Sequence, residues 1–158
     1  MAVKGEFDVR NIEIQLNINA PAESVFEAWT NPSVLQKWFS LEDSHTMPIV
    51  EIDLRTGAKY RIGIKHPDGS LRIIGGVFKR IIPNEMLSFT WSVGGGGTQQ
   101  KKSIVVVEFI NKTDGSGLVV KHQFITGEKL RFQFETEWKT RLARLEKVLA
   151  EGNIILNE

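Results

Sequence analysis

The stretch that decides the fold is TGEKLRFQFETEWKTRLARLEKVLAE, which covers residues 126–151. On a helix of about 3.6 residues per turn, its bulky apolar side chains fall on one stripe and most of its charged side chains fall outside it. The stripe consists of Leu130, Phe134, Trp138, Leu142, Leu145, Val148 and Leu149. The pattern predicts a long amphipathic helix whose broad apolar face needs an equally broad partner.

The predicted partner is a curved antiparallel sheet. Residues 11–19 alternate between apolar and polar side chains, which is typical of a strand with one buried face. Further candidate strands are separated by turns rich in Gly, Pro, Asn and Asp; they are 49–54, 59–65, 71–82, 85–93, 103–111 and 117–124. Pro21 and the pair Asn31-Pro32 predict two short helices after the first strand. We therefore expect an α+β fold in which about seven strands wrap around the C-terminal helix and leave a cavity between sheet and helix.

Composition narrows the classes of function. The chain has 158 residues, of which 20 are basic and 19 acidic, so no strong field favours nucleic acid or an anionic membrane as a partner. The absence of cysteine excludes disulfides and thiolate metal sites, and His45, His66 and His122 are too scattered in sequence to predict a metal site. No apolar run reaches the roughly 20 residues of a membrane span, and the N-terminus does not read as a signal peptide. We expect one cytoplasmic domain, residues 1–158, with no metal or cofactor.

Four segments, taken in order, carry a family resemblance. They are APAESVFEAWTNPSVLQKWF (20–39), DLRTG (53–57), GVFKRIIPNEMLSFTW (76–91) and the spaced positions Trp138, Leu142, Leu145 and Leu149. Over about residues 12–149 the chain resembles the family named after the activator of the ninety-kilodalton heat-shock chaperone ATPase. That family is a branch of the START-like, helix-grip superfamily, also called SRPBCC.

The resemblance implies the helix-grip fold and an apolar cavity able to hold a small hydrophobic molecule, but it implies no reaction. We favour a protein that binds a small hydrophobic or aromatic molecule and carries out no chemistry. One alternative is a stress-related, co-chaperone-like module whose partner is a heat-shock chaperone. A second alternative is a cyclase or hydrolase that uses the same cavity. No catalytic residues are assigned, and we lean toward a protein that is not an enzyme.

Strand parity predicts which side chains line the cavity. Many of the side chains expected to point inward are aromatic; they come from the strands, the two short helices and the C-terminal helix. A wall of this kind is found in many small-molecule sites. For each of these side chains the alternative is ordinary packing of the core. The predicted ligand-binding residues are Trp29, Trp38, Tyr60, Ile62, Phe78, Phe89, Trp91, Val107, His122, Phe124, Phe134, Trp138 and Arg141.

Two polar residues fall among these apolar ones. His122 shares its strand phase with Phe124 and should point inward, where a neutral imidazole could orient a ligand or act as a general base. The alternative that we favour is a core histidine bonded to a neighbouring hydroxyl or carbonyl group. Arg141 lies on the helix stripe, and we expect its stem to pack while its head reaches water. Otherwise Arg141 pairs with an inward carboxylate such as Glu108, or meets an acidic ligand.

Two segments leave further alternatives open. The glycines at 94–97 do not form a phosphate loop, because a strand and not a helix is expected to follow them. We interpret them as a flexible hairpin loop able to cover the cavity. Ile154, Ile155 and Leu156 are unusually apolar for a chain end. They either fold back on the helix or form a contact between copies, so both a monomer and a homodimer remain open.

Overall fold

The computed structural model describes residues 9–94 and 102–156. A strand comes first, two short helices follow it, and a run of six strands leads to the long C-terminal helix, as the sequence predicts. The elements are β1 (Val9–Ile18), α2 (Ala22–Thr30), α3 (Pro32–Trp38), β2 (Thr46–Ile52), β3 (Lys59–Lys65), β4 (Leu71–Ile82), β5 (Met86–Val93), β6 (Ser103–Lys112), β7 (Gly115–Thr126) and α4 (Glu128–Leu156).

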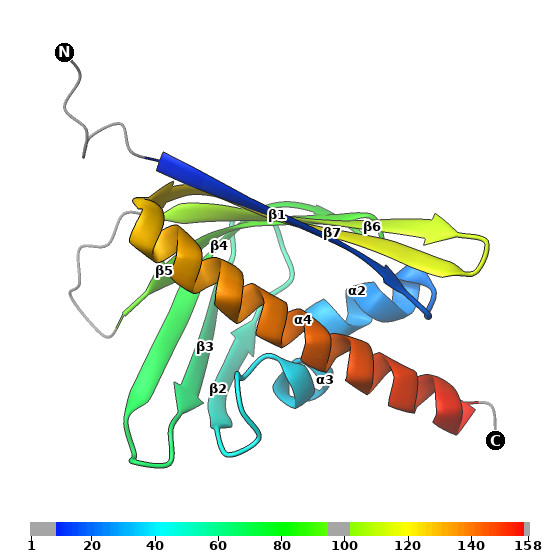
Figure 1. Cartoon of the computed structure of the whole chain (residues 1–158), viewed down its shortest axis with the longest axis horizontal. Helices are drawn as coiled ribbons and strands as arrows, with labels where there is room; N and C mark the ends of the chain where they lie inside the picture. The colour runs from blue at the N-terminus through cyan, green and yellow to red at the C-terminus, as the bar shows by residue number, and fades with distance from the viewer. Residues whose placement is uncertain (1–8, 95–101, 157–158) are drawn as a thin grey trace.

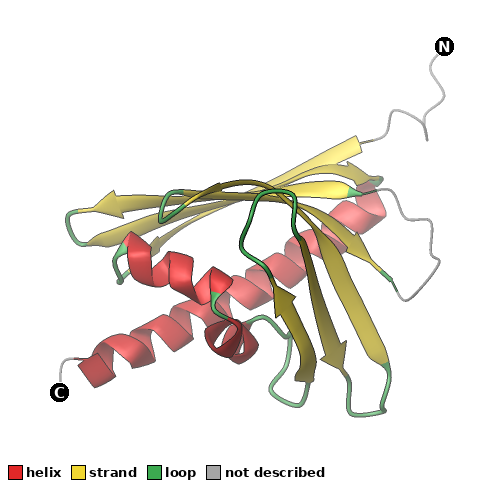
Figure 2. Ribbon diagram, turned by 180° about the vertical axis from the view of Figure 1, so that it is seen from behind, coloured by secondary structure: helices red, strands yellow, loops and turns green. Residues whose placement is uncertain are grey.

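The strands form one antiparallel sheet in the order β1-β7-β6-β5-β4-β3-β2. The sheet is curved, with β2 and β3 bent away from the plane of β1 and β7 (Figure 1). All three described helices lie on the same side of it, and α4 runs diagonally across that side (Figure 2). This arrangement confirms the predicted α+β, helix-grip architecture.

The stripe of α4 faces the sheet as predicted. Phe134, Trp138, Leu142 and Leu145 are all buried, and Leu130, Val148 and Leu149 pack against the core with partial exposure. Burying large apolar side chains in this way is the main favourable contribution to folding. The periodicity of one segment therefore identified the face on which the core is built.

The corner between the short helices also follows its sequence signals. Asn31 caps α3, because its side-chain oxygen accepts a hydrogen bond from the backbone N–H of Ser33 at 3.0 Å, and Pro32 takes the first helical position. At the end of α3, the indole Nε1 of Trp38 donates to the carbonyl oxygen of Ala28 at 2.9 Å. This bond fixes the two helices to each other and places Trp38 in the core.

The prediction that Phe124 points inward is wrong. Ile12 pairs with His122 and Arg10 pairs with Ile125, so β7 has one more residue than β1 between these pairs. The extra residue forms a β-bulge, at which Phe124 has φ 63° and its backbone N–H donates to the Asn11 side chain at 3.1 Å. A one-residue shift moves every following side chain to the other face. Phe124 is consequently 55% exposed, and Ile125 is buried in its place.

Two predictions concern residues outside those described. Most of the glycine loop, residues 95–101, and the side chains at 152–156 are not described, so the predicted flap and the alternatives for Ile154, Ile155 and Leu156 stay predictions. Within residues 9–94 and 102–156, no helix is long and apolar enough to cross a membrane.

Candidate functional site

An apolar pocket lies between the outer strands of the sheet and the short helices. The atom-free space in and around it is about 380 Å³, part of which is open solvent. The cavity itself, measured as the space available to the centre of a water molecule, is only about 30 Å³. Strands β2 to β5, helices α2 and α3 and the residue after α3 supply its walls. The lining residues are Trp29, Leu35, Phe39, Ile52, Tyr60, Ile62, Phe78, Leu87, Phe89 and Trp91.

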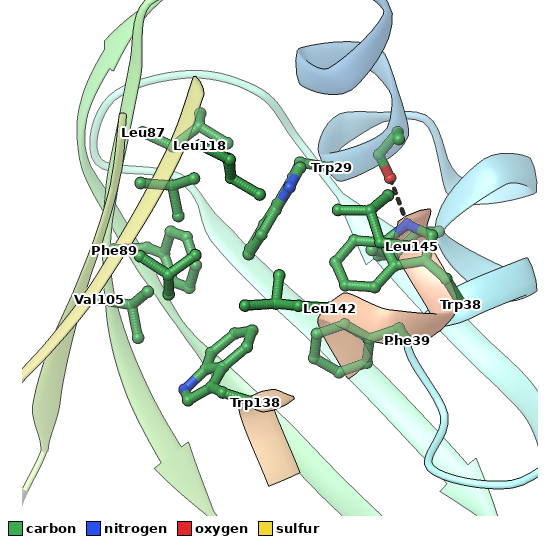
Figure 3. Packing of buried hydrophobic residues seen from close by; sticks show 14 of the residues in the cluster. Trp29, Trp38, Phe39, Leu87, Phe89, Val105, Leu118, Trp138, Leu142 and Leu145 are labelled. Carbon is green, nitrogen blue, oxygen red and sulfur yellow. Dashed lines mark hydrogen bonds between the residues drawn. The ribbon is translucent and has the colours of Figure 1, made fainter. Parts of the chain in front are cut away.

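This pocket lies to one side of the predicted position, because no residue of α4 lines it, and a cavity between the sheet and α4 stays a prediction. The space under α4 is filled by aromatic side chains. The rings of Trp138 and Trp29 stack with centroids 5.7 Å apart, and the ring of Phe134 stacks on that of His122 at 4.9 Å. Figure 3 shows Trp29 lying between the sheet residues Phe89 and Leu118 and the helix residues around Trp138. These ring contacts fill the space around Trp138 and Phe134, and the pocket described above lies beside α2 and α3.

Six of the predicted ligand-binding residues meet at the pocket, and four lining residues were missed. Those brought together are Trp29, Tyr60, Ile62, Phe78, Phe89 and Trp91. Leu87 shares its strand phase with Phe89 and Trp91, so parity could have identified it. Leu35, Phe39 and Ile52 reach the pocket only because the α2–α3 corner and the edge strand fold against it, which no local pattern specifies.

The other predicted ligand-binding residues lie elsewhere. Trp38 and Val107 are fully buried in the core without lining the pocket, and Phe124 is exposed. Phe134, Trp138, His122 and Arg141 form a separate buried cluster under α4. The hydroxyl of Tyr60, which does line the pocket, donates to the Thr90 carbonyl oxygen at 2.7 Å, and burial raises its pKa. That hydroxyl therefore has a structural partner.

His122 lies in a chain of buried hydrogen bonds. The indole Nε1 of Trp138 donates to Nδ1 of His122 at 3.0 Å, and Nε2 of His122 lies 2.6 Å from Oγ of Ser103. An indole N–H can only donate, so Nδ1 carries no proton and the neutral ring carries its proton on Nε2. Nε2 then donates to Ser103, whose hydroxyl is directed to the carbonyl oxygen of Trp91 at 3.4 Å. The prediction of a core histidine bonded to a neighbouring hydroxyl is confirmed.

Ser103 and His122 are as close as a serine nucleophile and its general base, but the hydrogen bond between them runs in the opposite direction. A histidine that activates serine must accept the hydroxyl proton at Nε2, and here Nε2 already holds a proton. Burial, with the nearby charge of Arg141 as a second cause, lowers the pKa of His122 to about 3. The ring thus has neither the free nitrogen nor the basicity of a general base. The only acid–base candidate that the sequence offered is a structural residue.

We expect His122 to make the fold sensitive to mild acid. Its pKa is about 6.5 in the unfolded chain and about 3 in the folded one, so the unfolded chain binds more protons in between and stability falls as the pH falls. From about pH 7.5 to about pH 5 this contributes a loss of about 2 kcal/mol in the free energy of unfolding. His122→Gln keeps an acceptor and a donor but does not titrate, so its stability should depend less on pH. Urea unfolding across this range measures the difference, and parallel profiles for the two proteins would contradict the assignment.

Arg141 does not extend to water as expected. Its side chain is 1% exposed, and its Nε donates to the carbonyl oxygen of Phe39 at 2.9 Å. The guanidinium carbon lies 4.6, 5.6 and 5.3 Å from the ring centres of Phe39, Trp91 and Trp138. These aromatic faces and the carbonyl oxygen take the place of water around the cation, and burial lowers the pKa of Arg141 to about 10.

The predicted pairing of Arg141 with Glu108 is also wrong. Glu108 lies at the outer side of the sheet, where its carboxylate bonds Nζ of Lys121 at 3.0 Å with both side chains over a third exposed. The carboxylate nearest to Arg141 belongs to Glu137, one helical turn earlier, at 4.0 Å from Nη2. The third expectation, that Arg141 meets an acidic ligand, stays a prediction.

Two of the three histidines, read as scattered in sequence, are neighbours in the fold. The rings of His45, after α3, and His66, after β3, pack edge to face with centroids 4.4 Å apart. Nε2 of His45 also lies 3.5 Å from the Glu42 carboxylate. Across the described residues, however, no three side chains of His, Cys, Asp or Glu are gathered as a metal site would need.

The curved sheet, the long helix laid across it and the side pocket define a domain of the START-like, helix-grip class. A family model described as "Activator of Hsp90 ATPase homolog 1-like protein" matches residues 19–150, and the chain belongs to this family. The resemblance noted from the four sequence segments is therefore confirmed.

Solved structures of other proteins share the fold. An uncharacterized protein from Rhizobium leguminosarum has a TM-score of 0.80 at 23% sequence identity, covering 90% of this chain and 95% of that one. An AHSA1 protein from Silicibacter pomeroyi has a TM-score of 0.80 at 16% identity, covering 90% and 99%. An AHSA1-like protein from Aeromonas hydrophila has a TM-score of 0.79 at 19% identity, covering 91% and 94%. No curated protein matches the chain.

Proposed function

We propose that this protein binds a small hydrophobic or aromatic molecule in the pocket between β2–β5 and α2–α3. The observation that carries the proposal is the lining, which consists of aliphatic and aromatic side chains and contains no charged residue. A concave apolar surface of this kind is the usual form of a small-molecule site. Membership of a helix-grip family supports the same function.

The small free volume sets a condition on binding. Space for about one or two water molecules does not hold an aromatic ring. The lining side chains must therefore separate when a ligand enters. Ile52, on the edge strand β2, is the one lining residue of the pocket that is only partly buried, so we expect the pocket to open on that side.

We expect neutral apolar probes to stabilise the protein against heat. Naphthalenemethanol and decanol, each at about ten times its Kd, should raise Tm by about 3–6 °C. Ile52→Trp fills the pocket and should remove most of this shift in Tm. Leu54→Trp is the matched control and should keep the shift, because Leu54 is 39% exposed and does not line the pocket. Equal shifts for the two variants would place binding elsewhere, and no shift with any probe would contradict the function.

A second candidate function is a protein-interaction module that acts on a heat-shock chaperone. The observation that favours it is a pair of exposed aromatic residues on either side of the β7–α4 turn, with Phe124 55% and Phe132 65% exposed. Exposed aromatic side chains of this size are typical of contact surfaces. Binding to purified Hsp90 and stimulation of its ATPase test this function. Both should weaken in a Phe124→Ser, Phe132→Ser double variant if the surface is used.

A further inference from the structure

Three buried N–H groups next to the pocket have no acceptor among the described residues. They are Nε1 of Trp29, Nε1 of Trp91 and Nη2 of Arg141. Buried donors are nearly always paired in folded proteins, so a group of unpaired ones calls for an explanation. All three are hydrogen-bond donors, so a group that pairs with them must supply acceptor atoms.

The three donors belong to side chains that share one neighbour. Their side chains all pack on Trp138, with the Trp29 ring at 5.7 Å, the Trp91 ring at 5.2 Å and the Arg141 guanidinium carbon at 5.3 Å from its ring. The other unpaired buried side-chain atoms of the described residues, on His45, Ser116 and Arg144, belong to side chains with no ring contact to Trp138. The three unpaired donors therefore belong to side chains around one residue, Trp138, and two of these side chains are in contact, with the Arg141 guanidinium carbon 5.6 Å from the Trp91 ring centre.

That place borders the apolar pocket. Trp29 and Trp91 themselves line it. The Arg141 guanidinium lies against Phe39 and Trp91, which are both lining residues, at 4.6 and 5.6 Å from their ring centres. A molecule in the pocket thus contacts apolar side chains. The Arg141 guanidinium, with its unpaired Nη2, lies behind the rings of Phe39 and Trp91.

The local charge is positive and not balanced. Glu137 gives both carboxylate oxygens to Arg72, at 3.0 Å each, and Nη2 of Arg141 is left 4.0 Å from the nearer oxygen. Two guanidinium groups therefore share one carboxylate, and all three side chains are at least four-fifths buried. A buried charge without a full partner is unfavourable, and an anion placed beside Arg141 would relieve it.

We propose, building on the function proposed above, that the ligand of the pocket is an apolar or aromatic carboxylic acid whose carboxylate is bound by Arg141. The apolar body occupies the pocket, and the carboxylate supplies the acceptor that Nη2 of Arg141 lacks and balances the extra positive charge. A planar guanidinium is suited to this role because it can offer two parallel N–H groups to the two oxygens of a carboxylate.

The test compares acids with alcohols of the same apolar body. Naphthoic acid is paired with naphthalenemethanol, and decanoic acid with decanol, and binding near neutral pH is followed by the fluorescence of the four tryptophans. We expect each acid to bind the wild-type protein at least about tenfold more tightly than its alcohol. In Arg141→Met this preference should disappear while the alcohols still bind. Arg144→Met is the matched control, because Arg144 lies on the same helix as Arg141 but pairs with the exposed Asp43 and should leave the preference unchanged.

The outcomes separate the two proposals. If the alcohols bind the wild-type protein as tightly as the acids, the carboxylate inference is overturned and the binding function stands. If none of the four molecules binds, the binding function fails and the inference fails with it. A preference for acids that survives in Arg141→Met, or that is lost in Arg144→Met, places the anion site elsewhere and overturns the inference. Should Arg141→Met not fold, Arg141→Lys is used, and it should reduce the preference because an ammonium lacks the paired donors.

Discussion

Replacing Trp138 by alanine is expected to reduce the free energy of unfolding by about 3–5 kcal/mol. Trp138 is fully buried and contacts the rings of Trp29, Phe39 and Trp91, so truncation leaves a large cavity at the centre of the aromatic cluster. It also removes the N–H that bonds His122. Both losses act in the same direction, and denaturant unfolding measures their sum.

The variant Trp138→Phe separates the two contributions. It keeps an aromatic ring under α4 but leaves Nδ1 of His122 without its donor, so we expect a smaller loss of about 1–3 kcal/mol. Circular dichroism should show that both variants keep the folded secondary structure. A loss below about 1 kcal/mol for Trp138→Ala would mean that the cluster relaxes into the space and does not hold the sheet and helix together.

Replacing Gly76 by alanine is expected to cost about 3 kcal/mol or more in the free energy of unfolding. A Cβ at this position of β4 would overlap the carbonyl oxygen of Thr90 on β5 and lie 2.6 Å from its carbonyl carbon. Backbone atoms cannot turn aside as a flexible side chain can, so the two strands must separate. The same carbonyl oxygen accepts the Tyr60 hydroxyl, and the Thr90 hydroxyl oxygen accepts the N–H of Val77. The added methyl group therefore disturbs the wall of the pocket as well as the sheet.

Gly69→Ala is the matched control for Gly76→Ala. Gly69 has φ +91°, and a Cβ there would meet nothing within 4 Å, so only the strained backbone contributes and the loss should be about 1–2 kcal/mol. Denaturant unfolding of both variants gives the comparison. A Gly76 variant no less stable than the Gly69 variant would show that β4 and β5 can move apart at little cost.

Much of the fold could be predicted because its signals are local. The stripe of residues 130–149 follows from helical period, the corner at Asn31-Pro32 from capping and from the fixed φ of proline, and the strands from alternation between turns. Each signal depends on residues a few positions apart. The family resemblance then joined these elements into one architecture.

The candidate site was predictable only in part. Parity placed Tyr60, Ile62, Phe89 and Trp91 on the inner face, where they line the pocket. Parity failed at Phe124, because a bulge depends on how β7 pairs with Asn11, more than a hundred residues away. The positions of Leu35, Phe39 and Ile52 in the pocket and the contact between His45 and His66 also depend on distant segments meeting.

The sequence by itself determined the long amphipathic helix, the antiparallel strands and the family, because period, capping and turn chemistry act within short stretches of chain. Only the tertiary structure decided that His122 is bonded at both nitrogens, that Arg141 is buried among three rings, and that the pocket lies beside α2 and α3 and not beneath α4. The physical reason is that the burial of a polar group depends on which partners distant elements bring to it. Those partners are set by packing, which no local pattern encodes.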